Sequence, residues 1–187
     1  EAKSISHENT FAIDIQDPET LRAWLQELLG QVAMRMRRIG IKGKTVKIKV
    51  RFADFRTLSR NHTLATPTSS SHEIGIAGRE MLDRILREYP HPVRLLGAGM
   101  MNLSMGAAIQ QTLFDTEEKQ KLARIDETCD ELKQKFGQGV VRSASAIERG
   151  IGTHAQTRLI PNCKHSPHLE QPDVTLMLIK GFVENLG

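Results

Sequence analysis

Cysteine is scarce in this sequence of 187 residues: only Cys129 and Cys163 occur, and no Cys-x-x-Cys pair is formed. That scarcity excludes a disulfide framework and favours a reducing, cytoplasmic location. The sequence also lacks any apolar run that approaches the roughly 20 residues needed to span a bilayer, and no signal-peptide pattern opens it. We therefore expect neither a membrane protein nor a disulfide-stapled secreted one.

Clustered carboxylates are missing as well. Phosphoryl transfer with two metal ions needs acidic side chains that hold Mg²⁺ ions about 3.5–4 Å apart. Asp14, Asp17 and Asp54 instead stand singly along the chain. Gly97 and Gly99 fall inside an expected strand, so they do not indicate a loop that cradles phosphates. We therefore expect no catalytic residue, no metal site and no cofactor in this chain.

The composition is that of an ordinary globular protein, with 39% hydrophobic and 26% charged residues. Its charge is uneven. Residues 1–105 hold 16 Lys and Arg against 11 Asp and Glu, a net charge of +5, whereas residues 106–187 hold 10 against 11, a net charge of −1. The basic excess predicts a polyanionic partner for the first part. The chain begins at Glu1 without a methionine, which indicates a piece of something longer.

Residues 44–55, KTVKIKVRFADF, alternate between two kinds of side chain. Apolar residues at every second position predict a strand with one buried face, and Lys47, Lys49 and Arg51 then lie on the other face. One explanation is that lysines on an exposed strand face merely prevent edge-to-edge aggregation and bind nothing. The alternative is a cationic binding surface, which the basic character of the neighbouring sequence favours.

The remaining patterns predict a β-α-β-β-α-β order. Strands are expected at residues 4–15, 44–55, 62–68 and 93–103, with a turn at 56–61 and with helices that Asp17 and Ser70 cap. The fold class is α+β: two helices cover one face of a four-stranded sheet and leave the other face open. Trp24, Leu28 and Leu82 are expected to meet in one core between the helices and the sheet.

The open face combines cations with small hydroxyl groups. Ile5, Phe11, Ile13 and Ile15 of the first strand are expected on the buried face. The open face is expected to carry Ser4, Ser6, Glu8 and Thr10 on the first strand, Lys47, Lys49 and Arg51 on the second, and the groups around Ser59, Arg60 and Thr63. Such a surface suits phosphate oxygens, and its lack of aromatic residues argues against base stacking. It predicts binding to a nucleic-acid backbone without sequence readout.

Three segments carry a resemblance to a known family. KSISHENTF at 3–11, TLSRNHTL at 57–64 and PVRLLGAGMMNL at 92–103 resemble, in order and spacing, the little-finger domain of Y-family translesion DNA polymerases of the DinB type, also called DNA polymerase IV. The resemblance covers about residues 1–105. It implies a sheet that lies in the major groove of primer-template DNA and holds its phosphates. The contacts it implies are Ser4, Ser6, Ser59, Arg60 and Arg94.

A second specific pattern follows at Gln110-Gln111-Thr112-Leu113-Phe114. It matches the bacterial sliding-clamp-binding pattern Gln-x-x-Leu-Phe and resembles the segment that tethers these polymerases to the clamp. Leu113 and Phe114 would fill an apolar cleft while Gln110 bonds at its rim. We expect residues 106–116 to be a linker that presents this motif, although Leu113 and Phe114 could instead pack on the domain.

The last third of the chain is less informative. Leu122, Ile125, Cys129, Leu132 and Phe136 form a narrow apolar seam, which predicts a helix that ends at Gly137 within a helical extension over 117–149. Residues 150–187 form a tail of unknown role, in which the apolar run 174–179 suits one strand or helix. Irregular spacing disfavours a zinc site among His154, Cys163, His165 and His168.

The sequence thus predicts the non-catalytic C-terminal part of a translesion polymerase, which grips damaged primer-template DNA and is tethered to the sliding clamp. Magnesium would be held in the catalytic part of the parent. Two alternatives stay open. One is a catalytically inactive mutagenesis adaptor of the ImuB type, which also combines a little finger with a clamp motif. The other is an unrelated ferredoxin-like module that binds nucleic acid.

Overall fold

The computed structural model describes residues 4–105, 117–137, 140, 141, 173, 175–177 and 180. The chain divides into two compact units, Glu1–Gln110 and Gln111–Gly187. The first unit contains strands β1 (Ser4–Ile15), β2 (Ile41–Phe52), β3 (Thr57–Thr68) and β4 (Val93–Met105), with helices α1 (Pro18–Arg38) and α2 (Ser71–Glu88). The second contains α3 (Glu117–Phe136).

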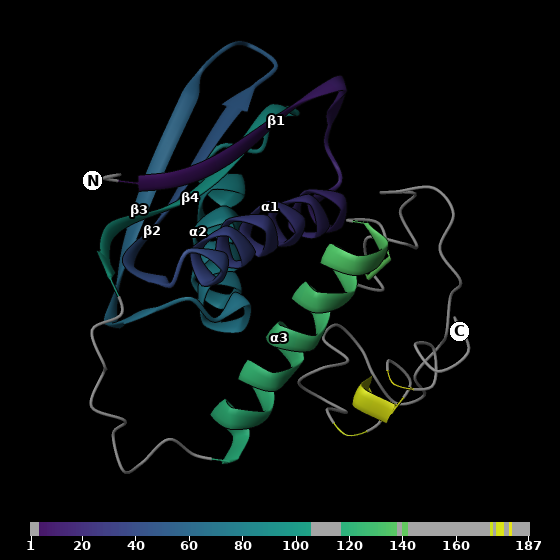
Figure 1. Cartoon of the computed structure of the whole chain (residues 1–187). Helices are drawn as coiled ribbons and strands as arrows, with labels where there is room; N and C mark the ends of the chain where they lie inside the picture. The colour runs from purple at the N-terminus through teal and green to yellow at the C-terminus, as the bar shows by residue number, and fades with distance from the viewer. Residues whose placement is uncertain are drawn as a thin grey trace. The chain divides into compact units, whose positions relative to one another are not determined.

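The four strands form one antiparallel sheet in the order β1-β4-β2-β3. The last strand in sequence therefore lies between the first and the second, and β1 and β3 are the edges. Both helices lie on the same side of the sheet (Figure 1). The predicted α+β fold with two helices on one face is confirmed.

Both predicted helix caps are present. The Asp17 carboxylate accepts a hydrogen bond from the Thr20 backbone N–H at 2.9 Å, and Pro18 occupies the first turn of α1. The Ser70 hydroxyl accepts from the Glu73 backbone N–H at 3.5 Å at the start of α2. Each cap satisfies a backbone donor that has no partner within the helix, so the local sequence fixes where the helices begin.

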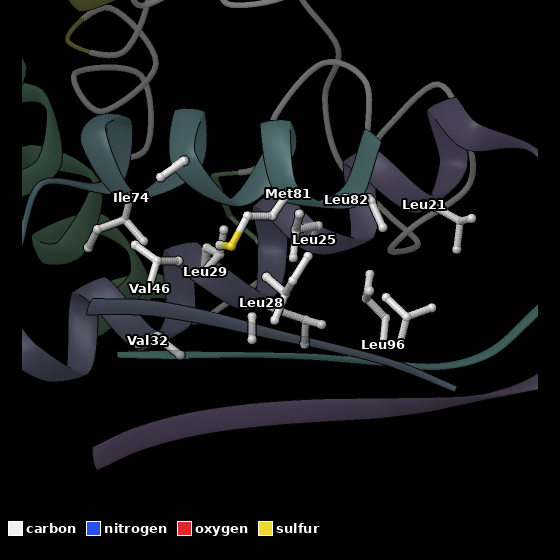
Figure 2. Packing of buried hydrophobic residues seen from close by; sticks show 14 of the residues in the cluster. Leu21, Leu25, Leu28, Leu29, Val32, Val46, Ile74, Met81, Leu82 and Leu96 are labelled. Carbon is white, nitrogen blue, oxygen red and sulfur yellow. The ribbon is translucent and has the colours of Figure 1, made fainter. Parts of the chain in front are cut away.

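The core fills the layer between the helices and the sheet, as Figure 2 shows. Leu28 and Leu82 are fully buried there, and Trp24 packs against the cluster from its margin. The Trp24 ring also lies 5.4 Å from that of Phe11 on β1. The prediction that Trp24, Leu28 and Leu82 share one core is confirmed.

The predicted start of β3 is wrong. The polar segment 57–61 was expected to form a turn, yet β3 begins at Thr57, and the turn is confined to residues 53–56. Thr57 to Thr63 pair in register with Arg51 to Thr45 of β2. An edge strand needs few apolar residues because one side of its backbone and much of its surface face water, so its sequence resembles that of a loop.

The predicted burial of Ile13 is also wrong, because its side chain is 83% exposed. Ile5, Phe11 and Ile15 do pack against the core. The pairing of β1 with β4 shifts register between Thr10 and Ile15. An irregularity of this kind breaks the two-residue alternation, which is why a pattern extended through it fails.

In the second unit, α3 buries Ile125 and Leu132, two residues of the predicted seam. It ends before Gly137, whose φ is +94° and whose N–H bonds to the Lys133 carbonyl at 3.0 Å. The described residues of the later apolar run are helical. His154, Cys163, His165 and His168 lie outside the described residues. In the part of the chain that the structure describes, no helix is long and apolar enough to cross a membrane.

Candidate nucleic-acid interface

The face of the sheet opposite the helices is built from alternate residues of all four strands. Strand register aligns them in cross-strand rows. From one end of the sheet to the other these rows are Ser4, Met101, Thr45 and Thr63; Ser6, Gly99, Lys47 and Asn61; Glu8, Gly97, Lys49 and Ser59; and Thr10, Leu95, Arg51 and Thr57. We call this set the open face. It contains no aromatic side chain.

The cations of the open face come from β2. Lys47 is exposed and has no acidic partner among the described residues. The Lys49 ammonium lies 3.0 Å from the Glu8 carboxylate of β1, and the Arg51 guanidinium donates to the Thr57 hydroxyl at 3.0 Å. All three therefore stand in a line on one strand, as predicted, with hydroxyl groups on the neighbouring strand β3 and, beyond β4, on β1.

A groove runs along the open face over β4, between β1 and β2. It is lined by residues of all three strands, among them Ser6, Glu8, Lys47, Lys49, Gly97 and Gly99. The two glycines form its floor. A Cβ atom at Gly99 would lie 2.9 Å from both the Ile5 carbonyl oxygen and the Ser6 Cβ, and one at Gly97 would lie 3.2 Å from the Glu8 Cβ. Glycine here permits close strand packing and keeps the groove clear of side chains.

Hydrogen bonds fix one end of the open face across three strands. The Asn102 amide of β4 donates to the Thr45 hydroxyl of β2 at 2.9 Å, and the Thr45 and Thr63 hydroxyls are 3.1 Å apart. Asn102 adopts a positive φ of 53°. Asparagine tolerates this conformation better than most residues, and its side chain is thereby aimed at Thr45.

Arg60 does not belong to the open face, which corrects the sequence-based expectation. It pairs with Ile48, a residue of the buried face, and its guanidinium lies 2.6 Å from the Glu88 carboxylate of α2. Ser59 pairs with Lys49 and does lie on the open face. The expected turn over residues 56–61 left the side-chain alternation of β3 undetermined, so the two neighbours were placed together.

Arg94 lies at an irregularity near the start of β4. Arg51 pairs with Leu95 and Phe52 with Val93, so Arg94 has no partner on β2. Its guanidinium makes two hydrogen bonds to the Asp14 carboxylate, at 2.9 and 3.0 Å, and lies 4.5 Å from the centre of the exposed Phe55 ring. The bond from Arg94 lowers the pKa of Asp14. Arg94 is thus already engaged within the domain.

Tyr89, which follows α2, connects the end of that helix to the β2–β3 turn. Its hydroxyl donates to Asp54, Arg56 lies 4.6 Å from the centre of its ring, and its ring stacks on His91. The hydrogen bond from Tyr89 lowers the pKa of Asp54, and the same bond raises the pKa of Tyr89. These contacts hold a turn whose Phe55 has a positive φ of 67°.

Metal binding finds no support in this arrangement. No three His, Cys, Asp or Glu side chains among the described residues come together as a metal site. Asp14 is bonded to Arg94 and Asp54 to Tyr89, so each carboxylate already has a partner.

Comparison with known proteins identifies the domain. The model of the impB/mucB/samB family C-terminal domain matches residues 2–113, more than half of the 187 residues. The chain belongs to this family. It carries the little-finger domain of a Y-family DNA polymerase of the DNA polymerase IV type.

Curated relatives agree with this assignment. DNA polymerase IV of Dehalococcoides mccartyi is 35% identical over 143 residues, covering 76% of this chain and 36% of that protein. DNA polymerase IV of Moorella thermoacetica is 35% identical over 145 residues, covering 78% and 36%. The chain thus spans about a third of the length of the curated relatives it matches.

The fold of the little-finger domain also matches solved structures. A Y-family polymerase chimera of Dbh and Dpo4 aligns with a TM-score of 0.50 at 14% identity, over 56% of this chain and 30% of the chimera. Such low identity shows the fold alone.

Most predicted contacts of the little-finger domain are brought together by the sheet. Ser4, Ser6, Lys47, Lys49, Arg51 and Ser59 share the open face, whereas Arg60 and Arg94 lie elsewhere. The groove floor was missed, although Gly97 and Gly99 at a spacing of two on one strand are a signal that could have indicated it. Gln110, Leu113 and Phe114 lie outside the described residues.

Proposed function

We propose that the open face of this little-finger domain binds the phosphate backbone of duplex DNA. The observation that carries the proposal is the line of Lys47, Lys49 and Arg51 beside the glycine-floored groove. Cations fix a protein on the duplex through phosphate oxygens without reading bases. The neighbouring hydroxyls of Ser6 and Ser59 add hydrogen-bond donors suited to the same oxygens.

The chemistry of the open face, in addition to family membership, favours duplex DNA as the partner. An aromatic-free surface does not suit single strands whose bases must be stacked, which disfavours single-stranded RNA as the ligand. The Lys49–Glu8 pair is exposed to solvent, so it is weak enough for a phosphate to compete for the ammonium group. In the parent protein the substrate would be primer-template DNA, including damaged DNA.

The test neutralises the line of cations. In Lys47→Gln/Lys49→Gln/Arg51→Gln, three phosphate contacts are lost, so the slope of log K against log salt should fall by nearly three units. Affinity at 0.1 M salt should drop on the order of 10²–10³-fold, equally for duplexes of different sequence. Fluorescence anisotropy over a salt series measures both quantities.

A matched control removes the same charge from the helix side of the domain. Arg79, Arg84 and Arg87 are exposed on α2, and their triple glutamine variant should keep the parent slope. Equal losses in the two triple variants would show that only net charge matters. A loss that depends on DNA sequence would contradict backbone binding.

We further propose that Gln110, Leu113 and Phe114 bind the bacterial sliding clamp. The support is the Gln-x-x-Leu-Phe pattern at residues 110–114, at the end of the family match over residues 2–113. Two adjacent apolar anchors suit an apolar cleft, and a clamp that already encircles DNA makes the second contact intramolecular. Tethering of this kind raises the effective concentration to roughly millimolar, which compensates for weak binding of DNA.

A peptide spanning residues 108–116 should bind a bacterial clamp by itself, and Leu113→Ala/Phe114→Ala in the full chain should abolish clamp binding while duplex binding stays intact. Surface plasmon resonance with immobilised clamp and immobilised duplex measures the two affinities on one variant. Gln111→Ala/Thr112→Ala changes only the variable positions of the motif and serves as control. Clamp binding that survives loss of both anchors would reject the tether.

For the parent protein we propose translesion DNA synthesis, with magnesium held outside this sequence. The support is the similarity to curated DNA polymerase IV proteins, of which this chain covers about a third. An inactive adaptor of the ImuB type is the alternative. The sequence of the parent gene distinguishes the polymerase from the adaptor. If an Asp and an Asp-Glu pair are encoded upstream of this domain, we expect the parent protein to extend primers in the presence of Mg²⁺. If other residues stand in place of these carboxylates, we expect an adaptor without polymerase activity.

A further inference from the structure

A second pocket lies on the outer side of β1, away from the groove over β4. It is lined by Ser4, Ile5 and Ser6 of β1 and by Arg35, Arg38 and Ile39 at the end of α1. β1 is an edge strand, so one side of its backbone has no strand partner among the described residues. The pocket therefore brings two arginine side chains beside the edge peptide groups of β1.

The two arginines of this pocket differ from the third arginine in the same turn. Arg37 donates to the Ser69 carbonyl at 2.7 Å and to the Ser71 hydroxyl at 3.0 Å, and thereby joins α1 to the start of α2. Arg35 and Arg38 are exposed, and neither has a hydrogen bond or an ion pair among the described residues. Two guanidinium groups without a partner among the described residues, beside the free edge of β1, form an anion-binding arrangement.

We propose that this outer pocket binds a phosphodiester group of the same DNA that the open face binds, an inference that rests on the proposed function. The first residues of β1 connect the two sites, because Ser4, Ile5 and Ser6 line both the pocket and the groove. β1 is thus a ridge with a cationic site on each side. A DNA backbone that crosses this edge meets Lys47 and Lys49 on one side and Arg35 and Arg38 on the other.

Arginines in the last turn of a helix have a structural role as well, since they offset the negative end of the helix dipole. That role and a phosphate site give different results in the salt dependence of DNA binding. Loss of a dipole contribution changes stability only, whereas loss of a phosphate contact changes the number of counterions released. The slope of log K against log salt therefore distinguishes them.

The experiment compares variants of the full chain on one duplex. Arg35→Gln/Arg38→Gln should lower the slope by about one unit and the affinity at 0.1 M salt by about eightfold. Arg35→Lys/Arg38→Lys retains the charges and should restore most of the slope. Arg84→Gln/Arg87→Gln removes the same charge from α2 and should leave the slope unchanged. Circular dichroism melts check that each variant folds.

Duplexes with different 5′ ends distinguish binding of an internal phosphodiester group from binding of a terminal phosphate. Duplexes with 5′-hydroxyl and with 5′-phosphate ends should show the same loss, because the proposal concerns internal phosphodiester groups. An effect confined to the 5′-phosphorylated duplex would overturn it, since the pocket would then take a terminal phosphate.

The triple variant of Lys47, Lys49 and Arg51 is measured in the same series. If it loses affinity while the Arg35/Arg38 glutamine variant keeps the parent slope, the outer pocket is not a phosphate site and the proposed function stands. If the triple variant keeps the parent slope, DNA binding by the open face fails, and the inference fails with it.

Discussion

The two faces of the little-finger sheet are made by alternate residues of the same strands, yet they are held to different physical requirements. On β2, Val46, Ile48 and Val50 are completely buried beneath the helices, whereas Lys47 between them is exposed. The helix-covered face depends on apolar area and close packing, and the open face on charge and on space for a ligand.

The basic side chains illustrate this difference. Arg60 and Arg94 are each bonded to a carboxylate and connect parts of the domain, while Lys47 and the pocket residues Arg35 and Arg38 are unpaired among the described residues. A basic residue that is paired with a carboxylate of its own domain thus has a structural role, whereas an unpaired one is available to bind a ligand. The residue type alone does not distinguish these two roles. Four predictions test the comparison of the two faces.

The largest effect is expected in the core. Leu82→Ala should lower the free energy of unfolding by about 2–5 kcal/mol, because Leu82 is completely buried in the cluster that Figure 2 shows. Its duplex affinity should match the parent under conditions where it is folded. Urea denaturation measures the free energy of unfolding, and fluorescence anisotropy measures the duplex affinity.

Ile76→Ala, on the exposed side of α2, is the control. If Ile76→Ala destabilised the domain as much as Leu82→Ala, the assignment of the core would be refuted.

The next effect concerns the floor of the groove. Gly99→Ala should destabilise the domain by about 1–3 kcal/mol, because the new Cβ would lie 2.9 Å from the Ile5 carbonyl oxygen. It should also weaken duplex binding by altering the groove. Gly75→Ala, on α2, where the new methyl group would meet nothing within 4 Å beyond its chain neighbours and the nearby backbone of its own helix, should instead stabilise by up to about 1 kcal/mol. Thermal and urea melts measure both, and a neutral Gly99→Ala would contradict the close strand packing.

A smaller effect is expected when a cation of the open face, Lys47, and a cation on the helix side, Arg60, are each replaced. Lys47→Gln should lower the salt slope of duplex binding by about one unit, and Arg60→Gln by clearly less, because Arg60 is directed to Glu88. Arg60→Gln should instead cost up to about 1 kcal/mol of stability, the range of exposed ion pairs. An Arg60 variant whose salt slope falls as much as that of Lys47→Gln would show that Arg60 leaves Glu88 for the DNA.

The smallest effect concerns pH. Because Arg94 lowers the pKa of Asp14 in the folded state, this pair stabilises the domain above the unfolded pKa of about 3.9, and its contribution is lost as pH falls through the folded value. Asp14→Asn should therefore show a weaker loss of stability on acidification below about pH 4. The part contributed by Asp54, whose pKa is also lowered, should remain. Urea melts from pH 2.5 to 6 give the comparison, with parallel pH profiles as the contrary result.

Much of the fold could be predicted from local sequence. The alternation of apolar and polar residues predicted which side chains of β2, and of β1 up to Thr10, lie on each face of the sheet. Asp17 and Ser70 predicted where the two helices begin. Both signals depend only on residues that are close together in the sequence. Prediction failed at the start of β3 and at Ile13. An edge strand has little apolar pattern to detect, and the shift in register is caused by the neighbouring strand.

The α+β class, the cationic strand, the apolar core and the motifs that place the chain in its family can all be recognised in the order of the residues alone. Which basic side chains have no partner among the described residues depends on how the strands and helices pack. Strand register put Arg60 on the helix side, the irregularity near Arg94 directed it to Asp14, and the edge position of β1 brought Ser4 and Ser6 beside Arg35 and Arg38. These juxtapositions join residues distant in sequence, and their geometry follows from packing of the whole sheet, which no local pattern encodes.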